Sequence, residues 1–266
     1  MRHKFVHLCS LGGIVFYLAF RFATTKEFDL FTAQDWLDNK KWFDIKLLVD
    51  ATRNDANHCK AMANNTYSEA IKTTLKKLNI PSNHWVHLGR TLGPKILELL
   101  EEESDDIRRL GNWNPSIQES SYSIKLPLSP MRKLAGYTTA NGMYHNARTT
   151  VMPSEALKLR TPFAFAISIL PQVSQALLND EGAKDSTGQT ALGFLKFMNE
   201  SSVIFLQDAA AMMISKPERR DHPLFRRLGC FEGADWDVSF SFVFSWLIVA
   251  SFCFVTNPLV LSEFRR

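Results

Sequence analysis

Four residues in the middle of the chain have side chains suited to chemistry at a phosphodiester. They are His87, Arg90, Trp113 and Tyr122, in which Arg90 precedes Trp113 by 23 positions and Trp113 precedes Tyr122 by nine. A guanidinium can bind two phosphate oxygens at once and stays charged at any working pH. An imidazole or an indole N–H can donate a further hydrogen bond, and a phenol can attack phosphorus. Taken singly, each residue also has a structural interpretation, such as a solvated arginine or a tryptophan that fills a core.

Short helices separated by turns are expected to position these four side chains. A helix over 88–103 would begin beside the histidine and arginine, with Pro94 in its first turn or at a kink. A further helix would begin at Ser104, because the two aspartates that follow favour the positive end of the helix dipole. Residues 111–115 predict a turn, and 116–123 a short helix that carries the tyrosine.

An additional helix is predicted upstream, over 66–78. Thr66 could cap it, and Glu69 could complete a capping box three residues later. Three apolar residues would form one stripe along it, namely Ile71, Leu75 and Leu78.

The order and spacing of the four residues resemble the C-terminal catalytic segment of tyrosine recombinases. In that family an H-x-x-R motif begins a helix, a turn of the form Leu-Gly-His/Asn-Trp follows, and a tyrosine lies on a later helix. This chain has His87 and Arg90 at the first motif, Trp113 at the second and Tyr122 after it. The resemblance implies that Arg90, His87 and Trp113 stabilise the phosphate and that Tyr122 is the nucleophile, because the charge that develops on phosphate oxygens needs fixed donors.

Further segments extend the resemblance over about residues 8–236. They are residues 85–90, 106–114, 121–127 and 131–137, with 9–21 upstream and 151–153 and 221–225 downstream. Together they resemble the second domain of the fungal centromere-DNA-binding kinetochore protein family, which is similar to the recombinases of Crypton transposons. The resemblance implies a mainly α fold, in which recombinase-like catalytic-domain helices are followed by a helical extension. It also implies a double-stranded DNA partner and a location in the nucleus.

The recombinase site is incomplete as written. Family members with working chemistry need another arginine, and usually a lysine, well before the H-x-x-R motif. Between the first few residues and Arg90 this chain has only Arg21 and Arg53, and neither is in that context. The resemblance to the kinetochore family therefore implies DNA binding without strand cleavage, with the four catalytic-type residues kept from an ancestor.

Basic side chains near the H-x-x-R motif are expected to line the duplex backbone. Such contacts give an affinity that depends on salt and largely not on sequence. Several of these side chains could instead solvate helix faces, and the acidic run 101–103 weakens local attraction to phosphate. The expected DNA-binding residues are Arg90, Lys95, Arg108, Arg109, Lys125, Arg132 and Lys133.

Composition excludes several classes of protein. With 266 residues, 45% of them hydrophobic and 22% charged, the chain is neither a disordered tail nor a fibrous repeat. The net charge of +4 permits a polyanionic partner without requiring one. The four cysteines are widely separated and form no C-x-x-C pair, so we expect reduced, mostly buried thiols and no zinc module. No metal or organic cofactor is implied.

The apolar N-terminal segment over 8–20 imitates a secretory signal. Arg21 and Phe22 close the run without a cleavage site, and Val15, Leu18, Ala19 and Phe22 recur at helical spacing. We therefore expect a buried helix here.

The C-terminal segment 238–255 has no charged residue over 18 positions, the usual length for a transmembrane candidate. Its first part, 239–245, alternates with a period of two as a half-buried strand would. A membrane span, a buried or aggregation-prone tail, and an artefact of the gene model all remain open for this segment.

The expected organisation is a recombinase-like DNA-binding core over 1–140 that lacks the N-terminal part of the catalytic domain, a helical extension over 141–236, and an apolar tail over 237–266. Two other functions stay open. One is an active tyrosine recombinase or transposase fragment with Tyr122 as nucleophile, and the other is a membrane-anchored protein. The sequence also leaves open a homodimer.

Overall fold

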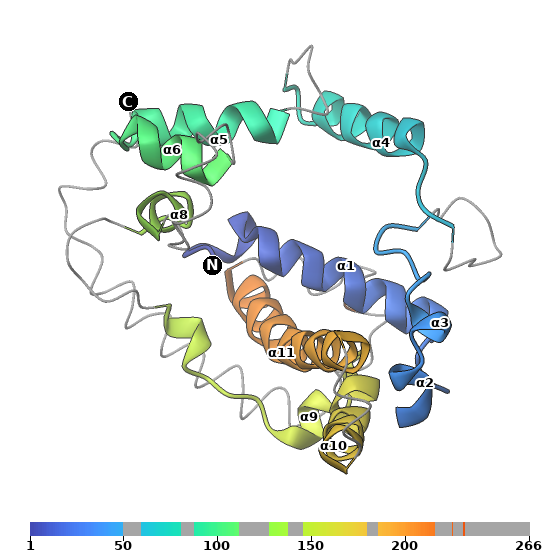
Figure 1. Cartoon of the computed structure of the whole chain (residues 1–266). Coiled ribbons are helices and arrows are strands. Elements are labelled where there is room, and N and C mark those ends of the chain that lie inside the picture. The colour runs from blue at the N-terminus through green and yellow to red at the C-terminus, as the bar shows by residue number, and fades with distance from the viewer. Residues whose placement is uncertain are drawn as a thin grey trace. The chain divides into compact units, whose positions relative to one another are not determined.

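The computed structural model describes residues 1–49, 60–80, 88–111, 128–137, 146–179, 186–215, 225 and 231. These residues form α-helices and short 3-10 helices and contain no strand, apart from an isolated antiparallel bridge between Val49 and Ala61 (Figure 1). The prediction of a mainly α fold is confirmed. The likeness of these helices to a recombinase catalytic domain stays a prediction.

The chain forms two compact units. The first consists of Met1–Leu8 and Ile45–Tyr144, and the second of Cys9–Asp44 and His145–Arg266. The expected division into a core, an extension and a tail stays a prediction.

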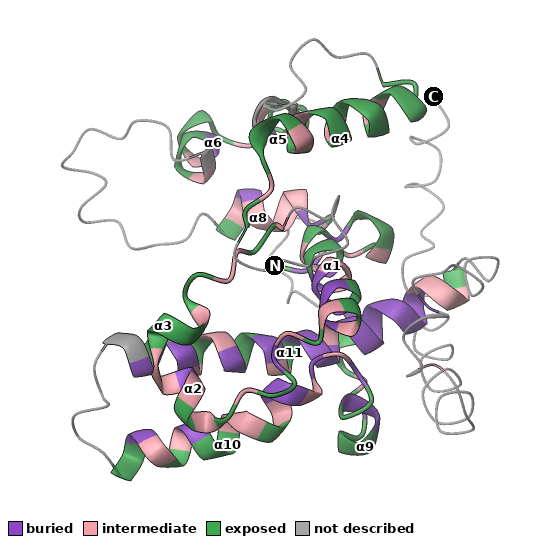
Figure 2. Cartoon of the chain, turned by 90° about the vertical axis from the view of Figure 1, so that its right-hand side faces the viewer, coloured by how far each residue is buried: buried purple, intermediate pink, exposed green. Residues whose placement is uncertain are grey.

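In the second unit, the 30-residue helix α11 (Ser186–Ser215) is central. Figure 2 shows buried residues along much of its length, and Phe205 to Ala211 are all buried. A helix that is buried on every side must be surrounded by other elements. Those that pack on it are α1 (Ser10–Thr25), α2 (Ala33–Leu37), η3 (Ala147–Thr149), α9 (Glu155–Lys158) and α10 (Ala164–Asn179).

Helix α1 confirms the buried helix predicted at the N-terminal end. Val15, Leu18, Ala19 and Phe22 are each no more than 6% exposed. Cys9 caps the helix, because its sulfur accepts a hydrogen bond from the Gly12 N–H at 3.4 Å. The Cys9 thiol is free and buried, as expected; Cys59, Cys230 and Cys253 lie outside the described residues.

An aromatic cluster joins α2 to α10 and α11. Trp36 is fully buried, and its ring centroid lies 5.0 Å from that of Phe28 and 5.6 Å from that of Phe194. The indole of Trp42, in the neighbouring helix α3 (Asn39–Trp42), donates a hydrogen bond to the Trp36 carbonyl at 2.9 Å. Each such ring pair contributes about 0.5–1.5 kcal/mol beyond the burial of area.

In the first unit, three helices pack against one another: α5 (Leu88–Leu99), α6 (Ser104–Gly111) and α8 (Leu128–Leu134). Leu97 is fully buried between them, and Ile107 is 6% exposed. Helix α6 begins at Ser104 as predicted. Helix α5 ends four residues before the predicted end. Pro94 lies in its interior, which excludes the first of the two predicted placements, in the first turn, and leaves the second, at a kink. Proline cannot donate the helical hydrogen bond to the carbonyl four residues earlier.

Helix α4 (Asn64–Lys77) also belongs to the first unit, and the capping box predicted for it is wrong. The helix begins two residues before Thr66, after Ala63, and no side chain caps it. Thr66 thus lies inside the first turn, where its hydroxyl cannot take the N-cap position.

The segment Met1–Leu8 packs on the end of α8. The Lys4 N–H donates to the Ala135 carbonyl at 2.8 Å. Gly136 ends the helix with φ +79, and ring atoms of His3 lie 3.2 Å from the position that a Cβ would take there. The left-handed dihedral and the close ring both favour glycine.

The apolar C-terminal run, 238–255, lies outside the described residues. Within the ranges that are described, no helix is both long and apolar enough to cross a bilayer.

Candidate nucleic-acid interface

The four catalytic-type residues are only partly covered by the structure. Arg90 lies in the first turn of α5, where the backbone is described. His87, Trp113 and Tyr122 lie outside the described residues, so their convergence on one phosphate stays a prediction. Lys125, one of the expected DNA contacts, also lies outside them.

Helix α5 carries Lys95 five residues after Arg90 and two residues before the buried Leu97. Lys95 is exposed, because Leu97 faces α6 and α8 while the side chain two positions earlier projects in another direction. Its ammonium is therefore accessible to an anion.

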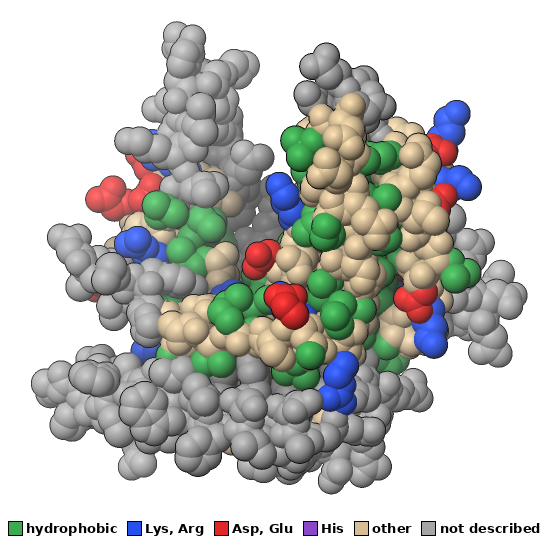
Figure 3. Space-filling model, turned by 90° about the horizontal axis from the view of Figure 1, so that it is seen from below, with side chains coloured by type: hydrophobic (Ala, Val, Ile, Leu, Met, Phe, Trp, Pro, Cys, Tyr) green, Lys and Arg blue, Asp and Glu red, His purple; other side chains and the backbone are tan. Residues whose placement is uncertain are grey.

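Helix α6 presents two arginines toward solvent, each beside an aspartate one turn earlier. Arg108 contacts Asp105, and Arg109 Nη1 lies 3.8 Å from Asp106 Oδ1. The two arginine side chains are 61% and 54% exposed. Exposed i,i+3 pairs of this kind contribute about 0–1 kcal/mol, so a phosphate can replace the aspartate at little cost. Figure 3 views the molecule from below and shows basic side chains directly beside acidic ones on that face as well.

Lys133 on α8 has a different environment. Its ammonium lies 2.7 Å from Glu102 Oε2 and donates to the Leu100 carbonyl at 2.8 Å, and its side chain is 14% exposed. Ser129 also donates to Glu102, at 3.1 Å. Two of the three N–H donors of Lys133 are therefore engaged in holding α8 to the turn after α5.

The acidic residue in this contact is stabilised in its charged form. Burial by itself would raise the pKa of Glu102, but the hydrogen bonds from Lys133 and Ser129 outweigh it and hold the pKa below its ordinary value. The acidic run 101–103 was expected to weaken local attraction to phosphate. One of its carboxylates, that of Glu102, is only 3% exposed and belongs to the packing of the unit.

Arg132 precedes this lysine and is half-buried. Its Nε is buried and has no hydrogen-bond partner in the described part of the chain. An unmet buried donor costs about 1–3 kcal/mol. Because this nitrogen is buried, an approaching phosphate does not reach it directly.

Helix α4 carries basic residues that were not among the expected DNA contacts. Lys72, Lys76 and Lys77 are all exposed on it. Their signal was present in the amino-acid sequence, as three lysines within six positions of a predicted helix.

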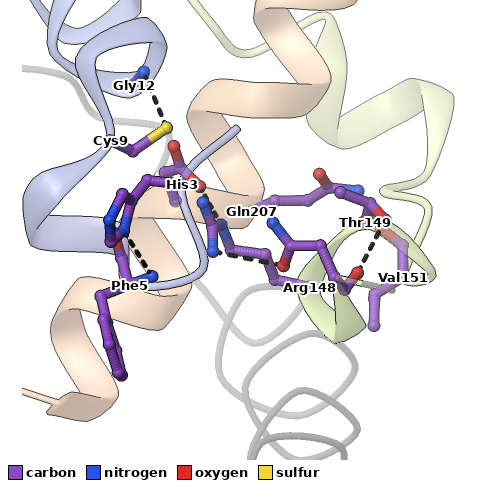
Figure 4. A network of polar contacts seen from close by, with 10 residues as sticks. His3, Phe5, Cys9, Gly12, Arg148, Thr149, Val151 and Gln207 are labelled. Atoms are coloured by element: carbon purple, nitrogen blue, oxygen red, sulfur yellow. Dashed lines mark hydrogen bonds and ion pairs between the residues drawn. The ribbon is translucent and has the colours of Figure 1, made fainter. Parts of the chain in front are cut away.

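The second unit contains a buried polar network that the sequence did not indicate either (Figure 4). Arg148 Nε donates to Asp208 Oδ1 at 2.6 Å, and both side chains are at most 4% exposed. Gln207 donates to the Val151 carbonyl at 2.6 Å. These contacts tie the loop around η3 to the C-terminal half of α11, so the network is structural. Arg21, one of the two arginines between the first few residues and Arg90, is likewise buried, and its Nε lies 3.0 Å from Glu27 Oε1.

Over the described ranges the protein is all-helical, and the exposed arginines of α6 give it a surface suited to an anionic partner. A family model described as centromere DNA-binding protein complex CBF3 subunit, domain 2, matches residues 1–236, and the chain belongs to this family. No curated protein and no solved structure shows a significant match to the chain.

Membership confirms the predicted kinetochore family over nearly the predicted range. It implies a role in centromere DNA binding and a location in the nucleus. The relation to Crypton recombinases, the fate of strand cleavage, and the particular DNA contacts stay predictions.

Proposed function

We propose that this chain is a DNA-binding domain descended from a Crypton-type tyrosine recombinase, which holds the duplex backbone through the α5–α6–α8 part of its first unit and does not cut strands. The observation that carries the proposal is the exposure of Arg108 and Arg109 on α6, in a chain whose family binds centromere DNA. Arg90 and Lys95 on α5 belong to the same group of packed helices.

Electrostatics favours the replacement of an aspartate by a DNA phosphate at each exposed arginine. Each exposed arginine leaves a weak ion pair with an aspartate and gains a phosphate, and every phosphate neutralised releases condensed counterions from DNA. The affinity should therefore fall as salt rises, with a log–log slope of about 0.9 for each phosphate that is neutralised.

The experiment is a titration of a random duplex with the full 266-residue chain at several salt concentrations. The double variant Arg90→Ala, Arg108→Ala should bind more weakly and reduce the slope by about two units, because it neutralises two phosphates fewer. A control variant, Lys40→Ala with Lys196→Ala, removes the same charge from exposed positions of the second unit and should keep the slope. Absence of duplex binding by the wild-type chain would refute the proposal.

The fate of strand cleavage needs a separate assay. A nicked suicide duplex traps a phosphotyrosine adduct if Tyr122 attacks phosphorus, since the leaving strand diffuses away. We expect no adduct. An adduct that forms with the wild-type chain and is absent from Tyr122→Phe would establish an active recombinase instead.

A further inference from the structure

Helix α4 has no fully buried face. None of its side chains is buried (Figure 2), and it forms no extensive contact with another described helix. Isolated helices of about this length are only marginally stable in water, and most helices in proteins depend on packing. The accessible surface of α4 is thus available to a partner.

The residues of α4 separate into two faces. At about 3.6 residues per turn, Tyr67, Ile71 and Leu75 fall on one side, of which Ile71 and Leu75 are half-buried. The opposite side carries exposed polar side chains: Asn65, Lys72, Thr73 and Lys76, which can donate hydrogen bonds, the acidic Glu69 among them, and Lys77 at its edge.

The lysines of α4 outnumber its acidic residue by three to one. Glu69 is the one acidic residue of α4, and its contact with Lys72 is long, at 3.4 Å, between side chains that are 67% and 51% exposed. Lys76 and Lys77 form no ion pair within the described part of the chain. On α6, in contrast, each arginine has its own aspartate.

The helix dipole explains the positions of only some of the lysines on α4. Cations in the last turn of a helix are favoured by its negative end, which accounts for Lys76 and Lys77. Lys72 lies more than one turn earlier, where the dipole effect has faded. Lysine, threonine and asparagine are all among the side chains that hydrogen-bond to DNA phosphates.

We propose that α4 is a second DNA-contacting element, whose face of Asn65, Lys72, Thr73 and Lys76 lies along the sugar-phosphate backbone of a duplex. This rests on the proposed function of the chain as a DNA-binding domain. An α-helix of about 10–12 Å diameter fits beside or within a major groove of about 12 Å width, so the backbone on either side is within reach of these lysines.

The test compares the full chain with the triple variant Lys72→Ala, Lys76→Ala, Lys77→Ala. Binding to a random duplex is measured over a range of salt concentrations, and circular dichroism checks that the variant folds. We expect the log–log slope to fall by about 0.9 for each phosphate that the variant no longer neutralises. A second variant, with arginine at all three positions, should restore the slope because it keeps the charge.

The control variant is Lys40→Ala, Lys41→Ala, Lys196→Ala, which removes the same charge from exposed positions of the second unit. If the wild-type chain binds DNA and the α4 variant keeps the full slope, the inference is overturned while the proposed function stands. If the α4 variant alters only self-association in sedimentation, α4 contacts a second copy and the inference is also overturned. If the wild-type chain does not bind DNA, both fail.

Discussion

Two adjacent glycines at the start of α1 should respond in opposite ways to alanine. A Cβ at Gly12 would lie 2.4 Å from Asp208 Oδ2, a distance at which one of the two atoms must move. The carboxylate cannot swing aside easily, because Asp208 is fully buried and Arg148 holds it at 2.6 Å. Disrupting a buried pair costs about 3–5 kcal/mol, whereas alanine gains about 1 kcal/mol in helix propensity. Gly12→Ala should therefore destabilise the chain by about 2–4 kcal/mol.

Gly13→Ala is the matched control, since Gly13 is exposed and nothing lies within 4 Å of its Cβ position. It should stabilise the chain by up to about 1 kcal/mol. Urea unfolding followed by circular dichroism measures both variants. In an Asp208→Ala background the cost of Gly12→Ala should disappear, because the obstructing carboxylate is gone. Equal effects of the two glycine substitutions, or an unchanged cost in that background, would refute this account of the contact.

Three further predictions concern the first unit. Because the folded pKa of Glu102 is depressed, the stability that its carboxylate contributes is present above the ordinary value of 4.5 and is lost as pH falls through the folded pKa. Glu102→Gln should cost about 1–3 kcal/mol of unfolding free energy near neutral pH and remove this loss in acid. Urea unfolding on both sides of pH 4.5 measures both effects. Gly136→Ala should cost at least about 1–2 kcal/mol because its φ is +79, and a similar cost at the open position Gly93 would contradict this reason. Leu97→Ala should cost about 2–5 kcal/mol of unfolding free energy by opening a cavity. Amide hydrogen exchange should then become faster in α5, α6 and α8 than in α11, and an equal increase in all four helices would contradict the separate packing of the first unit.

Local patterns made part of this fold predictable. Val15, Leu18 and Phe22 recur at helical spacing, so the buried face of α1 followed from the sequence without knowledge of its partners. The start of α6 at Ser104 followed likewise from the two aspartates next to it, which favour the positive end of the helix dipole. Both depend on residues within a few positions of one another.

Contacts between distant residues were not predictable in this way. Arg148 and Asp208 are 60 positions apart, and Glu102 and Lys133 are 31 apart, so neither pair has a local signature. The second pair changes the interpretation of both of its residues. Glu102, expected to weaken attraction to phosphate, is buried, and Lys133, expected to bind DNA, holds α8 to the turn after α5. Only packing determines which charges remain available to a partner.

The candidate site was predicted from a family pattern more than from physics. The spacing of His87, Arg90, Trp113 and Tyr122 indicated the resemblance, and the family match over 1–236 supports it. Hydrogen-bond reach around one phosphate is a property of three dimensions, and three of these residues lie outside the described ranges.

The order of segments in the two units has a consequence for synthesis on the ribosome. The second unit takes α1, α2 and α3 from before residue 45 and the remainder of its helices from after residue 144. When α1 leaves the exit tunnel, α11 has not yet been translated, so the apolar side of α1 must wait for about a hundred and sixty further residues, counted from the end of α1 to the start of α11. A nascent chain of this protein should accordingly be a chaperone client until α11 emerges.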